Sequence, residues 1–193
     1  MKVSWKDAQE NECAWTKSAW ETGELTIERR RKDLFWRLGY FGIPPEELED
    51  KVVADIGCGP LSMFSFLRVK QLIAVDPLVN KFEKFMAIKF PQGHITGRGE
   101  ELPIPDESTD HVFAINLLAH VDDPARVVEE MKRILKRGGI LALHSNLNEH
   151  LDTMHLHSFT AEELDSMMSG LVKLRDKVVF DVIEQYYSVW RKV

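Results

Sequence analysis

The chain has 193 residues, a length that favours one domain large enough to bury a core without disulfides or a structural metal. Its 25 Lys and Arg against 31 Asp and Glu give a net charge of −6, which disfavours nucleic acid as a partner. The sequence has neither an apolar run of about 18 residues, as a membrane span needs, nor the apolar stretch of a secretory signal near its charged start. We therefore expect a cytoplasmic protein without a membrane partner, either a monomer or a homodimer.

The first part of the chain, from Ser4 to Tyr40, predicts a helical cap in which tryptophans are interspersed with charges. A stretch rich in Gly and Pro from residue 39 to residue 45 ends this cap, because both residue types interrupt helices. We place a boundary near residue 45, so that one domain contains a cap at 1–45 and a Rossmann-like core at 46–193.

After residue 45, short apolar runs alternate with amphipathic stretches. We predict strands at 52–56, 72–75, 94–96, 111–116 and 140–144, and helices at 61–68, 79–89 and 124–136. Apolar strands separated by helices are typical of a parallel sheet with helices on both faces. The sequence therefore predicts an α/β fold with a doubly wound sheet.

The last part of the chain differs from this alternation. A helix is expected at 159–169, with Ser158 or Thr160 as its N-cap. The apolar runs at 171–180 and 183–190 follow with no room for a helix between them. They predict an antiparallel hairpin at the edge of the sheet.

The most informative stretch is Lys51–Pro60, where an apolar run ends in the glycine turn Asp55-Ile-Gly-Cys-Gly-Pro60. A negative charge at Asp55 is unfavourable for a dinucleotide pyrophosphate but suits the cationic amino group and sulfonium of S-adenosyl-L-methionine (SAM). Asp76 ends the next apolar run, 17 residues after Gly59, where a carboxylate can accept from both ribose hydroxyls. Either acid alone could simply cap a turn or a helix, but together they predict a nucleoside site.

The order of these motifs resembles that of class I SAM-dependent methyltransferases. Asp55–Pro60 is similar to their first motif, Val75–Pro77 to their ribose-binding acid, and Gly99–Asp110 to the adenine-framing segment of the ubiquinone and menaquinone C-methylase group. His111–Pro124 resembles the fourth-strand motif, and Glu130–Leu141 the helix and turn before the fifth strand.

This resemblance covers roughly residues 50–170. It implies a seven-stranded sheet whose last strand is antiparallel, SAM as cofactor and S-adenosyl-L-homocysteine as product. The residues that would bind the cofactor by position are Asp55, Gly57, Cys58, Gly59, Asp76, Pro77, Gly99, Glu100 and Asn116.

Three residues depart from the family pattern. Leu61 stands where a third glycine is frequent, and Arg137 replaces a common proline. Arg98 stands where an aspartate often accepts from the adenine amino group, so that contact would be lost or pass to Glu100 or Glu101. Cys58 and Cys13 lack a Cys-x-x-Cys spacing, and we expect Cys58 to be a small apolar turn residue, not a reactive thiol.

The acceptor side of the site is less defined. Methyl transfer chiefly requires alignment and exclusion of water, and a base helps only where the acceptor must lose a proton. His120 and His144, after the fourth and fifth predicted strands, are weak candidates for that base. His150, Asp152, His155 and His157 raise a minor alternative of a metal site, but their spacing matches no known pattern and we expect no metal.

The cap is the natural lid over the acceptor. Its tryptophans could line an apolar acceptor pocket or simply pack the cap onto the sheet; they are Trp5, Trp15, Trp20 and Trp36. The basic run Arg29–Lys32 could receive an anionic acceptor or form a solvated helix face.

Three functions remain open from the sequence. The first is a methyltransferase with a small-molecule acceptor. The second is a SAM-binding regulatory or partner subunit without catalysis, which the departure at Arg98 motivates. The third is an NAD-dependent oxidoreductase, because Gly57-x-Gly59 also begins a dinucleotide fingerprint, although Asp55 and Leu61 argue against it.

Overall fold

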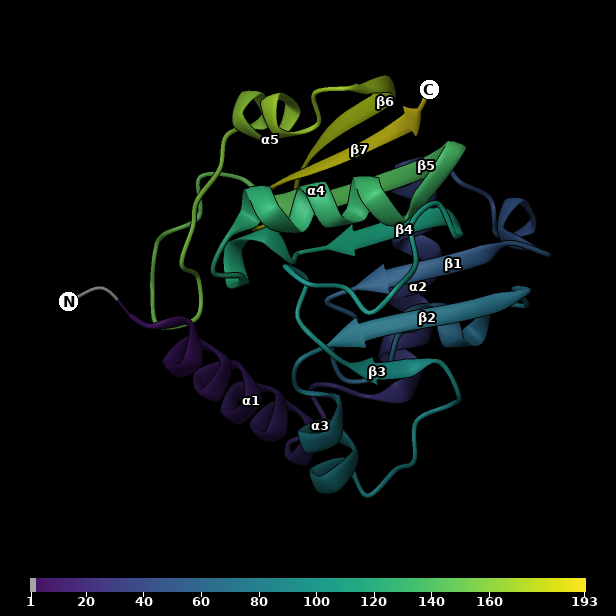
Figure 1. The fold of residues 1–193 in the computed structure, drawn as a ribbon. Coiled ribbons are helices and arrows are strands. Elements are labelled where there is room, and N and C mark those ends of the chain that lie inside the picture. The colour runs from purple at the N-terminus through teal and green to yellow at the C-terminus, as the bar shows by residue number, and fades with distance from the viewer. Residues whose placement is uncertain (1–2) are drawn as a thin grey trace.

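A computed structural model describes residues 3–193. Seven strands form a single sheet in the order β3-β2-β1-β4-β5-β7-β6 (Figure 1). Their bounds are β1 Val52–Ile56, β2 Gln71–Asp76, β3 His94–Thr96, β4 Thr109–Ile115, β5 Leu135–Asn146, β6 Leu171–Phe180 and β7 Glu184–Lys192. The pairs from β3 to β5 are parallel, whereas β7 is antiparallel to both β5 and β6. The predicted α/β sheet and its terminal hairpin are confirmed.

Within residues 3–193, five α-helices lie around the sheet. They are α1 Trp5–Glu21, α2 Ile27–Phe41, α3 Val79–Met86, α4 Pro124–Ile134 and α5 Ala161–Met167. The cap that the sequence predicts as one helical segment is therefore two helices. The break falls at residues 22–26, where Thr26 is extended and its side chain accepts from the amide of Arg29 to begin α2.

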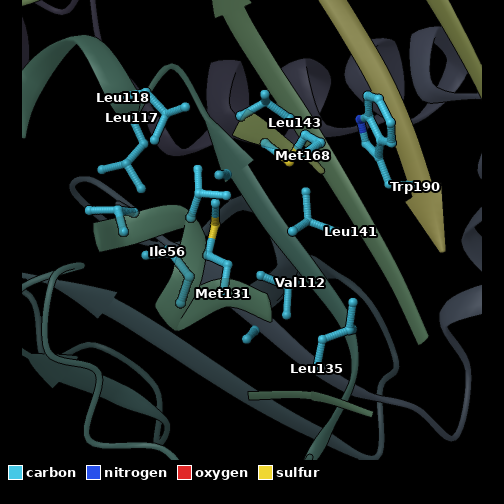
Figure 2. Packing of buried hydrophobic residues seen from close by; sticks show 14 of the residues in the cluster. Ile56, Val112, Leu117, Leu118, Met131, Leu135, Leu141, Leu143, Met168 and Trp190 are labelled. Carbon is cyan, nitrogen blue, oxygen red and sulfur yellow. The ribbon is translucent and has the colours of Figure 1, made fainter. Parts of the chain in front are cut away.

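The two faces of the sheet carry separate cores. In Figure 1, α4 lies in front of the sheet and α2 behind it. Figure 2 shows the α4 side, where Ile56 and Val112 pack with Met131. On the other side, Leu38 of α2 packs with Val53. Because side chains alternate along a strand, Asp55 shares the face of Val53 and points toward the α2 side.

The predicted helix at 61–68 is wrong. Leu61 has a left-handed φ of 86°, and only a 3-10 turn follows, at Met63–Phe66. Ser62 begins this turn, with its side chain accepting from the amide of Phe64. The left-handed residue and the adjacent Pro60 prevent the strand from passing directly into an α-helix.

Several predicted boundaries also shift. The helix expected at 159–169 begins only at Ala161, with Thr160 as N-cap in a reciprocal capping box with Glu163. The strand expected at 140–144 extends from Leu135 to Asn146. Over residues 3–193, no helix combines the length and the apolar character that crossing a membrane requires.

Candidate functional site

A cavity of about 340 Å³ lies at the carboxyl ends of β1, β2 and β4. In Figure 1, α1 lies across from the arrowheads of these strands, and its side chains form part of the cavity wall. The lining includes eight of the nine residues expected to bind the cofactor, namely Asp55, Gly57, Cys58, Asp76, Pro77, Gly99, Glu100 and Asn116. Segments far apart in the sequence therefore meet at one site, as expected for a doubly wound sheet.

Gly59, the ninth residue, is not part of the lining, but it forms a hydrogen bond to Asp76, which is. Its amide donates to Oδ2 of Asp76 over 3.0 Å, while the amide of Leu78 donates to Oδ1 over 2.8 Å. Burial raises the pKa of Asp76 to about 6. Asp76 thus joins the glycine turn to the residue that precedes α3 and makes no cap bond to the helix itself, and its remaining lone pairs leave it able to accept further hydrogen bonds.

Asp55 is also a buried carboxylate on the cavity wall. Its Oδ2 accepts a hydrogen bond of 2.6 Å from the Ser62 hydroxyl. Burial raises the pKa of Asp55 to about 6, against the opposing effects of Ser62 and Arg30. Two desolvated acids at one end of a cavity favour a cationic ligand, because its charge would compensate for their burial.

The glycine turn is required by conformation and packing. Gly57 and Gly59 have φ values of 71° and 63°. A Cβ on Gly57 would lie 2.5 Å from Cδ1 of Leu117, so a larger residue would also require the Leu117 side chain to move. Cys58 is buried and its pKa is raised well above the usual thiol value by burial, which agrees with its expected role as a small apolar residue.

Arg30 holds this turn from the outside, a role that sequence reasoning missed. Its Nη2 donates to the carbonyl of Cys58 over 2.8 Å and to that of Leu61 over 2.7 Å, and its Nε also donates to Leu61. These bonds satisfy the carbonyls of a left-handed segment and tie α2 to the glycine turn. The basic run around Arg30 was the only sequence signal for this contact.

The expected adenine end is closed by residues that pair with one another. The guanidinium of Arg98 lies 4.0 Å from the ring centroid of Trp5, a cation–π contact. Glu100 accepts from Nε of Arg98 over 3.2 Å and from the amide of Asp122 over 3.0 Å. A Cβ on Gly99 would lie 3.1 Å from Val127, so α4 limits the size of this residue. The carboxylate of Glu100 is therefore already engaged within the protein.

Polar atoms without partners lie deeper in the cavity wall. Oδ1 of Asn116 and Nδ1 of His120 are buried and make no hydrogen bond within the protein. Oε2 of Glu12, on α1, is 3.7 Å from that nitrogen. Burial raises the pKa of Glu12 to about 7 and lowers the pKa of His120 to about 4. Unsatisfied buried atoms in a cavity are typical of a site that a polar ligand completes.

His144, the other histidine considered as a base, does not line this cavity. It is buried, with Nδ1 3.2 Å from Nη1 of Arg37 and Nε2 3.1 Å from Oε1 of Gln185. Burial, together with Arg37, lowers the pKa of His144 to about 3. Both ring nitrogens therefore have protein partners, and His144 lies outside the lining of the cavity where the base was expected.

The cap tryptophans and the loop histidines that the sequence singled out lie in different surroundings. Trp5 and Trp15 line the cavity, Trp20 packs near α3, and Trp36 is largely exposed. His155 pairs with Asp152, with 2.9 Å between Nδ1 and Oδ2. His157 bonds instead to the carbonyl of Val121, over 3.0 Å. Over residues 3–193, no three His, Cys, Asp or Glu side chains are grouped so that they could hold a metal ion.

These features fit the cofactor that the motifs imply. Asp55 and Asp76 provide buried carboxylates for a cationic ligand, the half-buried Glu12 provides a further acidic group, and Asn116 provides an unpartnered acceptor. The cavity volume is within the range of small-molecule sites.

Comparison with known proteins identifies the kind of domain and its fold. Residues 54–143 match a family model described as a methyltransferase domain. Over 107 residues the chain is 36% identical to a tRNA U34 carboxymethyltransferase of Campylobacter hominis, covering 50% of this chain and 36% of the relative. An uncharacterized methyltransferase of Mycobacterium tuberculosis is 31% identical over 114 residues, covering 55% of this chain and 46% of the relative. The chain thus matches less than half the length of these curated relatives.

Solved structures share the fold over most of the chain. A SAM-dependent methyltransferase of Thermotoga maritima, described as a possible histamine N-methyltransferase, has a TM-score of 0.62 at 22% identity, covering 81% of this chain and 89% of its own. The [4+2]-cyclase SpnF has a TM-score of 0.73 at 13% identity, covering 98% and 96%. Such low identities establish the fold alone. Together, the methyltransferase-domain match over residues 54–143, the fold and the motif order support a class I SAM-dependent methyltransferase domain, with S-adenosyl-L-methionine as its cofactor.

Proposed function

We propose that this chain transfers a methyl group from SAM to a small-molecule acceptor in the cavity beneath α1. The observation that carries the proposal is the composition of the cavity wall. Expected cofactor residues at the ends of β1, β2 and β4 share one space of about 340 Å³ with side chains of α1 and α2. An acceptor in that space would lie next to the cofactor and beneath a lid, as methyl transfer requires.

Each side chain then has a defined task. Asp76 would accept from the ribose hydroxyls, and Asp55 with Glu12 would provide a negative potential for the positively charged end of the cofactor. Asn116 would use its free Oδ1 to orient a donor group on either ligand. SAM supplies an electrophilic methyl group on a sulfonium sulfur. Trp5 and Trp15 would exclude water from the reacting atoms.

A base is available if the acceptor must lose a proton. The low pKa of His120 keeps its ring neutral at neutral pH, and Nε2, which lies 3.4 Å from the donor Nδ2 of Asn116, carries the lone pair that could accept a proton. Glu12, whose pKa is raised to about 7, lies beside it and could take the proton onward.

The alternatives have less support. The relatives from Campylobacter act on tRNA by name, but the net charge of −6 and the acids in the cavity disfavour a polyanion. An NAD site would place a pyrophosphate at the start of a helix, and within residues 3–193 only a 3-10 turn follows the glycine loop. A SAM-binding subunit without catalysis would bind the cofactor at the same wall and needs an activity test.

The decisive experiment combines binding and turnover. Purified protein is titrated with S-adenosyl-L-homocysteine and, separately, with NAD in a calorimeter. It is then incubated with methyl-labelled SAM and either a panel of small acids, phenols and amines or unmodified tRNA, with heat-inactivated protein as control. We expect the protein to bind S-adenosyl-L-homocysteine and to transfer the labelled methyl group to a small molecule. Binding without transfer would favour the non-catalytic subunit, and transfer to tRNA alone would replace the small-molecule acceptor.

A further inference from the structure

The face of α2 that lines the cavity carries charges at a regular spacing. Arg29, Asp33 and Arg37 are four residues apart and therefore share one side of the helix. The basic run at 29–32 does not act as a unit, since Arg31 and Lys32 are exposed and outside the lining.

Arg37 is held in place by a relay of hydrogen bonds. A guanidinium can only donate, so Nδ1 of His144, 3.2 Å from Nη1 of Arg37, must accept. The His144 proton is then on Nε2, which donates over 3.1 Å to Oε1 of Gln185. The hydroxyl of Tyr187 donates to the same oxygen over 3.0 Å. A pKa lowered to about 3 keeps His144 neutral throughout the physiological range, so this arrangement is stable.

Arg37 has charge and hydrogen-bonding capacity left over. Within residues 3–193 it forms no ion pair: its hydrogen bond is to the neutral His144, and the carboxylates of Asp55 and Asp33 act on its charge only at longer range. Arg30 differs, because its guanidinium already donates to the carbonyls of the glycine turn. A fixed guanidinium with free N–H groups on a cavity wall is suited to bind a carboxylate in a bidentate pair, through two parallel hydrogen bonds.

The space around Arg37 extends beyond the main cavity. A second cavity, of about 330 Å³, shares Arg37 and Asp33 with the first. Its wall contains the rings of Tyr40 and Tyr187, whose centroids are 4.9 Å apart, and of Trp36. A planar apolar group of a ligand could pack against these aromatic rings. Asp33 on the shared wall disfavours a second negative charge on the ligand.

We propose that Arg37 determines acceptor specificity by binding the carboxylate of an aromatic monocarboxylic acid, whose nucleophilic atom faces the cofactor residues in the main cavity. This inference rests on the proposed function, because it identifies the class of acceptor for the same site. His144 and Gln185 are the positioning residues that orient the guanidinium.

The test compares carboxylates with their neutral amides. Protein saturated with S-adenosyl-L-homocysteine is titrated calorimetrically with benzoate, 4-hydroxybenzoate and salicylate, and with the matching carboxamides. We expect wild-type protein to bind at least one of the acids about ten-fold or more tightly than its amide. Arg37→Gln should remove this preference while leaving the affinity for the homocysteine product unchanged. Arg31→Gln, exposed on the same helix, should leave both properties intact.

A second variant distinguishes a loss of carboxylate binding from a loss of folding. Arg37→Lys keeps a positive charge and a donor for His144 but loses the planar fork, so it should retain the melting temperature and only part of the preference. Equal binding of acids and amides, absence of binding by every acid, or full preference in Arg37→Gln would overturn the proposal. Arginine-dependent binding of tRNA but of none of the acids would also overturn it. Failure of wild-type protein to bind the homocysteine product would instead refute the proposed function.

Discussion

At the residue scale, Asp76 both bonds to the amides of Gly59 and Leu78 and lines the cavity. These hydrogen bonds and ligand binding are therefore compatible in one side chain. Glu12 has a comparable position on α1, where burial and the nearby charge of Asp76 raise its pKa to about 7. Each role can be tested by a substitution that removes charge and preserves shape.

Asp76→Asn should weaken binding of S-adenosyl-L-homocysteine by about 1–3 kcal/mol, since it replaces a charged acceptor of hydrogen bonds by a neutral one. Isothermal titration calorimetry measures this directly. Asp176→Asn on edge strand β6 is the matched control and should leave the dissociation constant unchanged. A dissociation constant for Asp76→Asn equal to that of wild type would show that Asp76 serves only to hold the glycine turn.

Glu12→Gln should make the ligand-free protein more stable at pH 8 and have little effect at pH 5. The pKa of Glu12 rises from its ordinary 4.5 to about 7 on folding, so the folded protein holds a proton that the unfolded chain releases. The stability that this group contributes is full below pH 4.5 and is lost as pH rises toward 7. Thermal melts of both proteins across this range measure the effect, and a difference that is constant with pH would contradict it.

At the scale of elements, α1 is held over the cavity by few hydrogen bonds. Gln9 donates to the carbonyl of His120 over 3.2 Å, and Asn11 donates to that of Thr153 over 3.1 Å. Ser4 caps the helix by accepting from the amide of Asp7 over 3.2 Å. Such a helix can open locally at a cost well below that of global unfolding, as ligand entry requires.

Ser4→Ala should cost about 0.5–2 kcal/mol of helix stability by removing this cap. We expect faster amide hydrogen exchange in α1 and weaker binding of the homocysteine product, because the closed lid becomes less populated. Thr160→Ala, the corresponding change at the N-cap of α5, should speed exchange there without altering binding. Equal loss of affinity in both variants would mean that α1 has no special role as a lid.

At the scale of the whole molecule, the cap and the sheet share a core. Phe113 of β4 is fully buried, 4.3 Å from the ring centroid of Phe64 and 5.9 Å from that of Phe41 in α2. The cap therefore cannot separate from the sheet without exposing apolar surface in both. Cap and sheet should unfold together.

Phe113→Ala should destabilise the protein by about 3–5 kcal/mol through lost burial and the cavity left behind. Urea unfolding followed by tryptophan fluorescence and by circular dichroism should give one coincident transition, because most of the tryptophans lie in the cap and the sheet dominates the ellipticity. Phe180→Ala, at a side chain that is 75% exposed, should change stability by less than about 0.5 kcal/mol. Two separate transitions in wild type would show that the cap is an independent unit.

Much of the fold was predictable because its signals are local. The apolar run before Asp55, the glycine turn and the acid at residue 76 are recorded in short stretches whose spacing fixes strand, turn and strand. The prediction of a helix at 61–68 was wrong for a local reason too. Leu61 has a left-handed backbone conformation, which the helix propensity of leucine does not indicate.

The sequence by itself determined the alternation of strands and helices, the terminal hairpin and the match to a methyltransferase domain, because periodicity and turn residues act over a few neighbours. Only the tertiary structure decided which distant side chains meet. Arg37 and His144 are 107 positions apart, and their contact depends on how α2 packs against β5. The pKa of Glu12 depends in the same way on how α1 packs against the rest of the cavity wall. Contacts of this kind follow from the relative placement of whole elements, which no local pattern encodes.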